Sequence, residues 1–315
     1  MAWEMTPAAG RGSEPRVAII ILHLDQREAL LDCLEACRKL DYDNYELIVV
    51  ENGAAATRWR QAAGDPRDVR VVGSPANVGY AAGNNLGIRD ACRRGADYVL
   101  LINDDALVVP ELLRELVGVG ERAADVGGLG PLVVDVDDPT KVWFAGAVFD
   151  PVRGDVRSFE ACAPSGAGAL IESDYVTGCC LLIKRSALER VGFLDERFFL
   201  YWEDTDWGLR ARRAGLRNVV VPRIQIRHRV AASSGGMGSP LRVYHRTRSH
   251  LVFVQRHAPA ALARLHARFA RDVAWLALKS TGPGRLRAAS AILAAVRDYH
   301  LGRTGAGPAW LWRRR

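Results

Sequence analysis

The sequence has no apolar run of the roughly 18 to 20 uncharged residues that a helix needs to cross a bilayer. Its first 16 residues are rich in Ala, Gly, Pro and charge, and they contain no apolar core of the signal-peptide kind. We therefore expect a cytoplasmic protein whose residues 1–15 form a disordered leader. With 49% hydrophobic and 25% charged residues, the composition is that of a globular protein.

The sequence also lacks several cysteine and nucleotide signatures. Its six cysteines have no framework spacing, and Cys33 and Cys37 have no nearby Cys or His that would complete a zinc site, so we expect reduced thiols. Neither the G-x-G-x-x-G dinucleotide fingerprint nor a P-loop lysine is present. The absence of a Gly-rich, Lys-containing signature also argues against a nucleotidyltransferase.

What the sequence does contain, from Val17 to about Arg122, is an alternation of buried strands and amphipathic helices. This alternation predicts βαβ units around a mainly parallel sheet. Polar residues follow the expected strands at Asp25, at 51–53 and at 103–105. Because residues just after the strands line the ligand crevice of such sheets, these positions are the first candidates for a site.

Asp104 and Asp105 are adjacent carboxylates at a strand terminus. Two such groups repel each other unless a cation or hydrogen-bond donors satisfy them. Mg²⁺ or Mn²⁺ suits the position, because a hard cation shares its coordination between carboxylates and phosphate oxygens. The alternative is that both acids lie in a solvated loop and that one of them caps a helix whose first residue is Pro110.

A second acidic group, Glu203, Asp204 and Asp206, begins an expected helix next to Tyr201 and Trp202. Asp in this position is often only a helix cap. Apolar and aromatic walls also raise the pKa of a carboxyl group and make it a usable base, and aromatic faces stack on sugar rings. Both interpretations stay open on these residues alone.

Two further features carry little weight singly. The small-residue loop from Asn77 to Asn85 runs into a helix, where glycines allow close approach of a ligand and a helix N-terminus favours phosphate. A tight turn explains that loop equally well. His228 follows an expected strand, and a lone histidine is usually an ordinary polar residue.

In this order, the segments resemble the inverting glycosyltransferases of family 2, especially their bacterial rhamnosyltransferase-like branch. The resemblance covers about residues 16–260 and depends on the stretches Val17–Leu22, Val50–Gly53, Asn77–Arg89, Asn103–Asp105, Thr177–Arg185 and Gly192–Gly215. It implies an α/β fold of the GT-A type, which is Rossmann-like with a mixed, mainly parallel sheet flanked by helices. The Q-x-x-R-W element of processive synthases is absent, which favours a single addition.

The resemblance assigns one set of residues to the nucleotide sugar: Glu51, Asn77, Gly79, Asn84 and Asp104. It assigns Mg²⁺ or Mn²⁺ to Asp105 and His228. The donor implied is a dTDP- or UDP-sugar carrying rhamnose or a hexose. This chain has His23-Leu24-Asp25 where relatives often have Asn-Tyr-Asn, Glu51 in place of the commoner Asp, and Asn103 in place of the first Asp of D-x-D. These departures imply a shift in nucleotide preference or looser metal binding.

The resemblance makes Asp204 the catalytic base, with Glu203 as its neighbour. Asp204 is expected to take the proton of the acceptor hydroxyl while that oxygen attacks the anomeric carbon from the opposite face, which inverts the configuration. Tyr201 and Trp202 are expected to contact the acceptor, which is a glycan, a lipid-linked compound or a natural product. The alternative is a non-catalytic nucleotide-sugar-binding or membrane-associated scaffold on the same fold.

The net charge of +7 is unevenly distributed, because residues 241–315 contain 15 Lys and Arg and two acidic residues. We expect a catalytic domain at 16–231, a mobile Gly/Ser loop at 232–240, and a basic helical C-terminal region at 241–315 that lies outside the catalytic centre. Basic helices with tryptophans suit an anionic surface at the inner face of the membrane, or an acceptor bearing a diphosphate. No nucleic-acid recognition module accompanies the charge, so no nucleic-acid partner is expected. A homodimer is an open alternative.

Overall fold

The computed structural model describes residues 14–53, 59–60, 68–159, 169–229, 239–278 and 283–312. Most of the expected leader and of the expected Gly/Ser loop lies outside these ranges. The last two residues of that loop are described and begin a helix, in which the Ser239 side chain accepts a hydrogen bond from the backbone N–H of Arg242.

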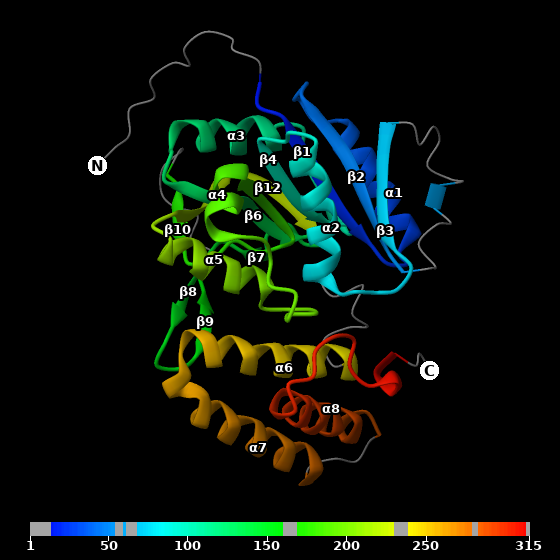
Figure 1. The fold of residues 1–315 in the computed structure, drawn as a ribbon, viewed down its shortest axis with the longest axis vertical. Helices are drawn as coiled ribbons and strands as arrows, with labels where there is room; N and C mark the ends of the chain where they lie inside the picture. Colours follow the sequence, from blue (N-terminus) through cyan, green and yellow to red (C-terminus); the bar gives the residue numbers. More distant parts are fainter. Residues whose placement is uncertain are drawn as a thin grey trace.

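The N-terminal half has the expected alternation of strands and helices (Figure 1). Its parallel strands are β1 (Val17–His23), β2 (Tyr45–Asn52), β3 (Val69–Ser74) and β4 (Tyr98–Asn103). Its helices are α1 (Arg27–Arg38), α2 (Tyr80–Arg93) and α3 (Leu112–Arg122). The apolar run of β1 is buried because helices cover the sheet, as the sequence predicted. The expectation that Pro110 opens α3 was wrong, since the helix begins two residues later.

The main sheet has the strand order β10-β12-β6-β11-β4-β1-β2-β3, with β5 and β7 at its side. Its remaining strands are β5 (Ala106–Leu107), β6 (Val126–Asp135), β7 (Val142–Phe144), β10 (Ile171–Ser173), β11 (Cys180–Lys184) and β12 (Arg217–His228). The sheet is mixed because β11 runs antiparallel to both of its neighbours, while β12 and β6 are parallel. The expected mainly parallel sheet flanked by helices is confirmed.

Two parts of the middle region differ from the sequence prediction. β6 was not predicted, because its glycines and Pro131 are typical of turns. In the fold these glycines permit close packing, since a Cβ at Gly128 would lie 2.8 Å from the Asn218 side chain. The segment from Tyr175 reads as a strand up to Lys184, but the strand begins only at Cys180, which leaves the backbone N–H of Gly178 outside the sheet ladder.

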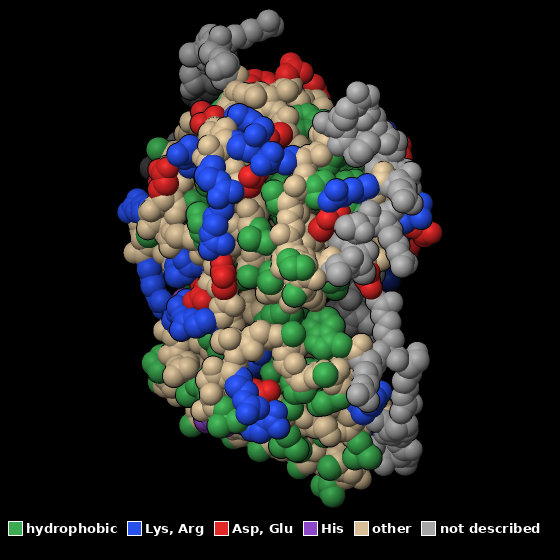
Figure 2. Space-filling model, turned by 45° about the vertical axis from the view of Figure 1, so that its right-hand side comes forward, with side chains coloured by type: hydrophobic (Ala, Val, Ile, Leu, Met, Phe, Trp, Pro, Cys, Tyr) green, Lys and Arg blue, Asp and Glu red, His purple; other side chains and the backbone are tan. Residues whose placement is uncertain are grey.

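Three helices form a separate layer beneath the sheet in Figure 1: α6 (Pro240–His257), α7 (Leu262–Leu278) and α8 (Pro283–His300). The hairpin of β8 (Ala147–Asp150) and β9 (Asp155–Ser158) reaches this layer, where the His250 imidazole bonds to the Gly154 carbonyl at 2.6 Å. On the face shown in Figure 2, Lys and Arg side chains lie among hydrophobic ones over the lower part of the molecule. In the described ranges, no helix is both long and apolar enough to cross a membrane.

Candidate active site

A cavity of about 360 Å³ lies where the ends of β4 and β12 meet the start of α5 (Glu203–Arg213). Its wall includes most of the residues singled out from the sequence, namely Asn77, Gly79, Asp104, Asp105, Tyr201, Trp202, Glu203, Asp204 and His228. Within the described residues, Glu51 and Asn84 do not line it. Polar residues that follow separate strands therefore meet at one edge of the sheet, as expected.

Asp105 and His228 face each other at this edge. The Asp105 Oδ1 and His228 Nε2 atoms lie 3.0 Å apart, and both side chains are buried. The contact is not aligned as a hydrogen bond, so Asp105 Oδ1 has no hydrogen-bond partner among the described residues. A carboxylate oxygen and an imidazole nitrogen in this arrangement suit a divalent cation that completes its shell with other oxygens. No third Cys, His, Asp or Glu of the described chain joins them.

Asp104 is bound by a residue that sequence reasoning did not assign. The His23 Nδ1 atom lies 2.9 Å from Asp104 Oδ2, and both groups are buried. Burial raises the pKa of Asp104, and the hydrogen bond from His23 opposes that rise. The strand pairing explains this contact. β1 and β4 are parallel neighbours with Leu22 opposite Asn103, so His23 lies beside Asp104.

The two assigned residues outside the cavity have protein partners. The Glu51 carboxylate accepts hydrogen bonds from the indole of Trp59 at 3.0 Å and from the guanidinium of Arg60 at 2.8 Å. The Asn84 amide donates to the Tyr80 carbonyl at 3.0 Å. The role of Glu51 in binding the nucleotide sugar therefore stays a prediction, for a carboxylate that two side chains already bind.

Asn52 organises the glycine loop, and sequence reasoning gave it no role. Its amide donates to the Asn77 side chain at 3.1 Å and accepts from the backbone N–H of Val78 at 2.8 Å. Gly79 has φ of +91°, and a Cβ there would lie 2.4 Å from the Phe199 carbonyl oxygen. Only glycine fits, because both the conformation and the space exclude a side chain.

The Glu203–Asp204 pair occupies the first turn of α5. The Asp204 carboxylate accepts hydrogen bonds from the Gly178 N–H at 2.9 Å and from the Thr205 N–H at 2.6 Å. Burial raises the pKa of Asp204, although these hydrogen bonds stabilise its charged form. Burial and the neighbouring Asp204 raise the pKa of Glu203 well above its usual value. Asp204 is thus a carboxylate at the cavity wall with an increased affinity for a proton.

The backbone just before this pair is strained. Tyr201 and Trp202 have φ of 68° and 73°, and they are the two non-glycine residues of the described chain with positive φ. Such conformations persist only where the surroundings hold them. The Trp202 ring stacks on His250 of α6, with 4.1 Å between centroids and 13° between planes. α6 therefore stabilises the strained turn that carries two residues of the cavity wall.

The expectation that the basic C-terminal region lies outside the catalytic centre was wrong. α6 contributes Leu241, Arg242 and Arg246 to the cavity wall, and Trp312 of the short helix η4 (Ala309–Trp312) contributes a fourth side chain. Charge and periodicity identified these elements as helices but could not show where they pack.

Residues 15–269 match the family described as glycosyltransferase-like family 2. This chain belongs to that family. The match includes the sheet, the acid pair of α5 and the whole of α6.

Among the relatives of this glycosyltransferase is the protein y4gI of Sinorhizobium fredii, which is 33% identical over 72% of this chain and 26% of its own length. The N-acetylglucosaminyl-diphospho-decaprenol L-rhamnosyltransferase of Mycobacterium tuberculosis is 27% identical over 67% of this chain and 75% of its own length. The chain thus spans about a quarter of the first relative and three quarters of the second. The predicted resemblance to family 2, with rhamnosyltransferases among the relatives, is confirmed.

A solved structure shares the fold. The mannosyltransferase PcManGT from Pyrobaculum calidifontis, in complex with GDP-Man and Mn²⁺, is 19% identical and matches 92% of this chain and 83% of its own with a TM-score of 0.53. The likeness confirms the predicted GT-A fold.

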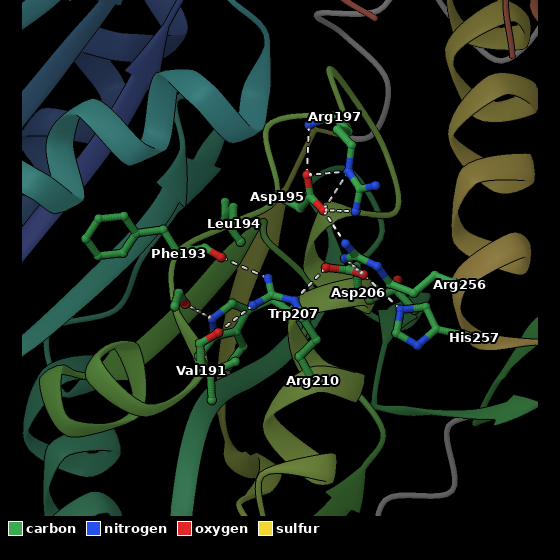
Figure 3. Close-up of polar contacts among 12 residues, drawn as sticks. Val191, Phe193, Leu194, Asp195, Arg197, Asp206, Trp207, Arg210, Arg256 and His257 are labelled. Atoms are coloured by element: carbon green, nitrogen blue, oxygen red, sulfur yellow. Dashed lines mark hydrogen bonds and ion pairs between the residues drawn. The ribbon is translucent and has the colours of Figure 1, made fainter. Parts of the chain in front are cut away.

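A buried ionic network fixes the start of α5 in this glycosyltransferase (Figure 3). The Asp206 carboxylate, which is fully buried, accepts hydrogen bonds from Arg210 at 2.8 Å and from Arg256 at 2.7 Å, and it lies 2.8 Å from His257 Nε2. Arg256 also pairs with Asp195 at 2.7 Å. The sequence places Asp206 in one acidic group with Glu203 and Asp204, and its partners show a structural role that joins α5 to the end of α6.

The buried Glu203 carboxyl group should make stability depend on pH. Because its pKa is raised in the fold, the folded state binds the proton more tightly than the unfolded chain. The stability that comes from this tighter proton binding is fully present below the pKa that Glu203 has in the unfolded chain. It is lost as the pH rises through the pKa that Glu203 has in the folded state. We therefore expect Glu203→Gln, which is neutral at every pH, to raise the melting temperature near pH 8 by roughly 2 °C or more.

Thermal unfolding of both proteins near pH 8 and near pH 4 measures this effect, which should shrink at the lower pH. Glu35→Gln, at an exposed glutamate of α1, is the control and should show no such stabilisation. A lower melting temperature for Glu203→Gln near pH 8 would contradict the interpretation.

Proposed function

We propose that this chain is an inverting glycosyltransferase that moves one sugar from a nucleotide-diphosphate donor to an acceptor hydroxyl, with Asp204 as the general base. The observation that carries the proposal is that Asp204, whose pKa burial raises, lines the same cavity as the Asp105–His228 pair. Such a transfer needs a base for the attacking hydroxyl and a group that stabilises the leaving diphosphate, and this cavity has a candidate for each.

The hydrogen bonds around Asp204 support its role as base. The Gly178 N–H binds Asp204 Oδ2, whereas the N–H and the hydroxyl of Thr205 both bind Oδ1, so the group is fixed while Oδ2 keeps a lone pair for the proton. The acceptor oxygen attacks the anomeric carbon from the face opposite the leaving diphosphate as Asp204 removes its proton. One displacement of this kind inverts the anomeric configuration.

Asp105 and His228 are the residues that would hold Mg²⁺ or Mn²⁺. The buried Asp105 oxygen that lacks an aligned hydrogen bond, 3.0 Å from His228 Nε2, fits such an ion. When bound, a divalent cation neutralises the charge that develops on the leaving diphosphate. The likeness to PcManGT, whose structure contains Mn²⁺, is consistent with this assignment.

A dTDP-sugar, with rhamnose first, is the proposed donor because the relatives include an L-rhamnosyltransferase, and a UDP-hexose is the alternative. That relative's name also specifies a diphospho-decaprenol acceptor, which supports a lipid-linked acceptor ahead of a free glycan or a natural product. We propose a cytoplasmic protein that meets such an acceptor at the membrane surface through its Arg-rich helices, which expose Trp275 and Leu278.

A panel of nucleotide sugars tests the function. We expect one donor to raise the melting temperature in the presence of Mn²⁺, with dTDP-rhamnose first, and to release nucleoside diphosphate when a competent acceptor is added. EDTA should abolish both effects, and Asp105→Asn should remove the metal-dependent part of the thermal shift. Release of pyrophosphate would indicate a nucleotidyltransferase instead. Binding without release across a broad acceptor panel would indicate the non-catalytic scaffold.

A further inference from the structure

Two arginines on α6 face the cavity without an acidic partner. Arg242 and Arg246 are four residues apart, so they lie on the same side of the helix, and both line the cavity. Within the described chain neither guanidinium pairs with a carboxylate, and Arg242 instead lies over the Tyr201 ring at 5.6 Å. Arg242 is half-buried and Arg246 is exposed to solvent, so both guanidinium groups are accessible to an anion that enters the cavity.

The nearby acids are already occupied. Asp155, which attracts Arg246, forms an ion pair with Arg268 at 2.8 Å. Asp204 accepts its hydrogen bonds from Gly178 and Thr205. Burial and the charge of Arg242 lower the pKa of Arg246.

Other arginines of α6 differ from these two. Arg256 pairs with the buried Asp206 and with the partly buried Asp195, and Arg248 donates to the Gly305 carbonyl at 2.8 Å. These two guanidinium groups bond to other parts of the fold and do not line the cavity, although Arg248 Nη2 has no hydrogen-bond partner among the described residues. Arg242 and Arg246 are distinguished by pointing their charge at the cavity.

The position of Arg242 and Arg246 relative to Asp204 indicates which substrate they contact. Arg246 acts electrostatically on Tyr175 and Tyr201, and Asp204 acts on the same Tyr175. The arginines therefore lie on the side of the cavity that carries the base, whereas the leaving diphosphate of the donor belongs with Asp105 and His228. Leu241 lines the wall beside them and offers an apolar surface.

We infer that Arg242 and Arg246 form an anion subsite on the acceptor side of the cavity, which binds a phosphate or diphosphate group that the acceptor carries. The inference rests on the proposed function, since it assigns the two sides of the cavity to donor and acceptor. A guanidinium suits this ligand because its planar donors bind phosphate oxygens in pairs. The subsite would place the reacting hydroxyl relative to Asp204 by holding the charged end of the same molecule.

Binding measurements with geranyl diphosphate test the subsite, with geraniol as the uncharged probe. The donor site is first saturated with dTDP or UDP and Mg²⁺, so that the probe does not occupy it. We expect the wild-type protein to bind geranyl diphosphate at least tenfold more tightly than geraniol. Arg242→Gln and Arg246→Gln should each weaken that binding about tenfold or more, and Arg246→Lys should restore part of it.

The affinity for the nucleoside diphosphate separates the two sources of phosphate. It should stay within about twofold of wild type in both glutamine variants. Arg271→Gln, at an exposed arginine of α7, is the matched control and should change neither affinity. A loss of nucleotide affinity in Arg246→Gln would overturn the inference, because the arginines would then serve the donor. Equal binding of geraniol and geranyl diphosphate would also overturn it. Failure of the proposed function would instead appear as a wild-type protein that binds no nucleoside diphosphate.

Discussion

Asp204→Asn should reduce the rate of sugar transfer about 10²- to 10⁴-fold and leave the affinity for the donor nucleotide nearly unchanged. The amide keeps the size of the carboxylate but cannot accept the proton of the acceptor hydroxyl. The rate is measured as release of nucleoside diphosphate, and the affinity by calorimetric titration with the nucleotide and Mn²⁺. Asp32→Asn, at an exposed aspartate of α1, is the control and should keep full activity.

The pH dependence of kcat/KM is a second test of the assignment of Asp204 as the base. Because burial raises the pKa of Asp204, the deprotonated base is lost as the pH falls through a value above the usual 3.8 of an aspartate. The acidic limb of kcat/KM for the wild-type protein should therefore lie above that value, and it should be absent from the residual activity of Asp204→Asn. Turnover of Asp204→Asn at the wild-type rate would remove Asp204 from the mechanism.

Asp206→Ala should lower the free energy of unfolding by about 3 to 5 kcal/mol, because it removes a fully buried carboxylate and leaves the partly buried Arg210 and Arg256 without their shared counter-charge. Arg210, Arg256 and His257 all contact this carboxylate. The loss should also free the end of α6 from α5. Denaturant titration measures the change.

Asp125→Ala is the matched control, since it breaks an aspartate–arginine pair at 2.7 Å whose side chains are exposed. Solvent-exposed pairs contribute about 0 to 1 kcal/mol, so this variant should remain close to wild type. If Asp206→Ala loses no more stability than Asp125→Ala, the network of Figure 3 does not hold the start of α5 in place.

The sequence was sufficient for the elements that local pattern determines. The alternation of buried strands and helices predicted the first four strands. Among the polar residues at their ends, Asn103, Asp104 and Asp105 line the cavity, whereas Asp25 and Glu51 do not. β6 was not predicted, because its glycines permit close packing against Asn218 and Trp207, which are distant in the sequence.

The partners of the candidate site were harder to predict than its members. Asp206 binds Arg256 and His257 across about 50 residues of sequence, and no local spacing indicates such a contact. The same reason hid the entry of α6 into the cavity, because an amphipathic pattern shows which face of a helix is buried but not against which element. The positive φ of Trp202 is a product of this packing.

The division of the cavity wall between two parts of the chain has an evolutionary consequence. Residues up to 229 supply the strand-end acids and the glycine loop, whereas α6 and η4 supply Leu241, Arg242, Arg246 and Trp312. Mutations in one stretch can alter the choice of one substrate and leave the other stretch untouched. On the inferred assignment of Arg242 and Arg246 to the acceptor, substitutions in α6 should change acceptor preference while the strand-end acids stay the same, provided that contacts such as Arg256–Asp206 still join the two stretches.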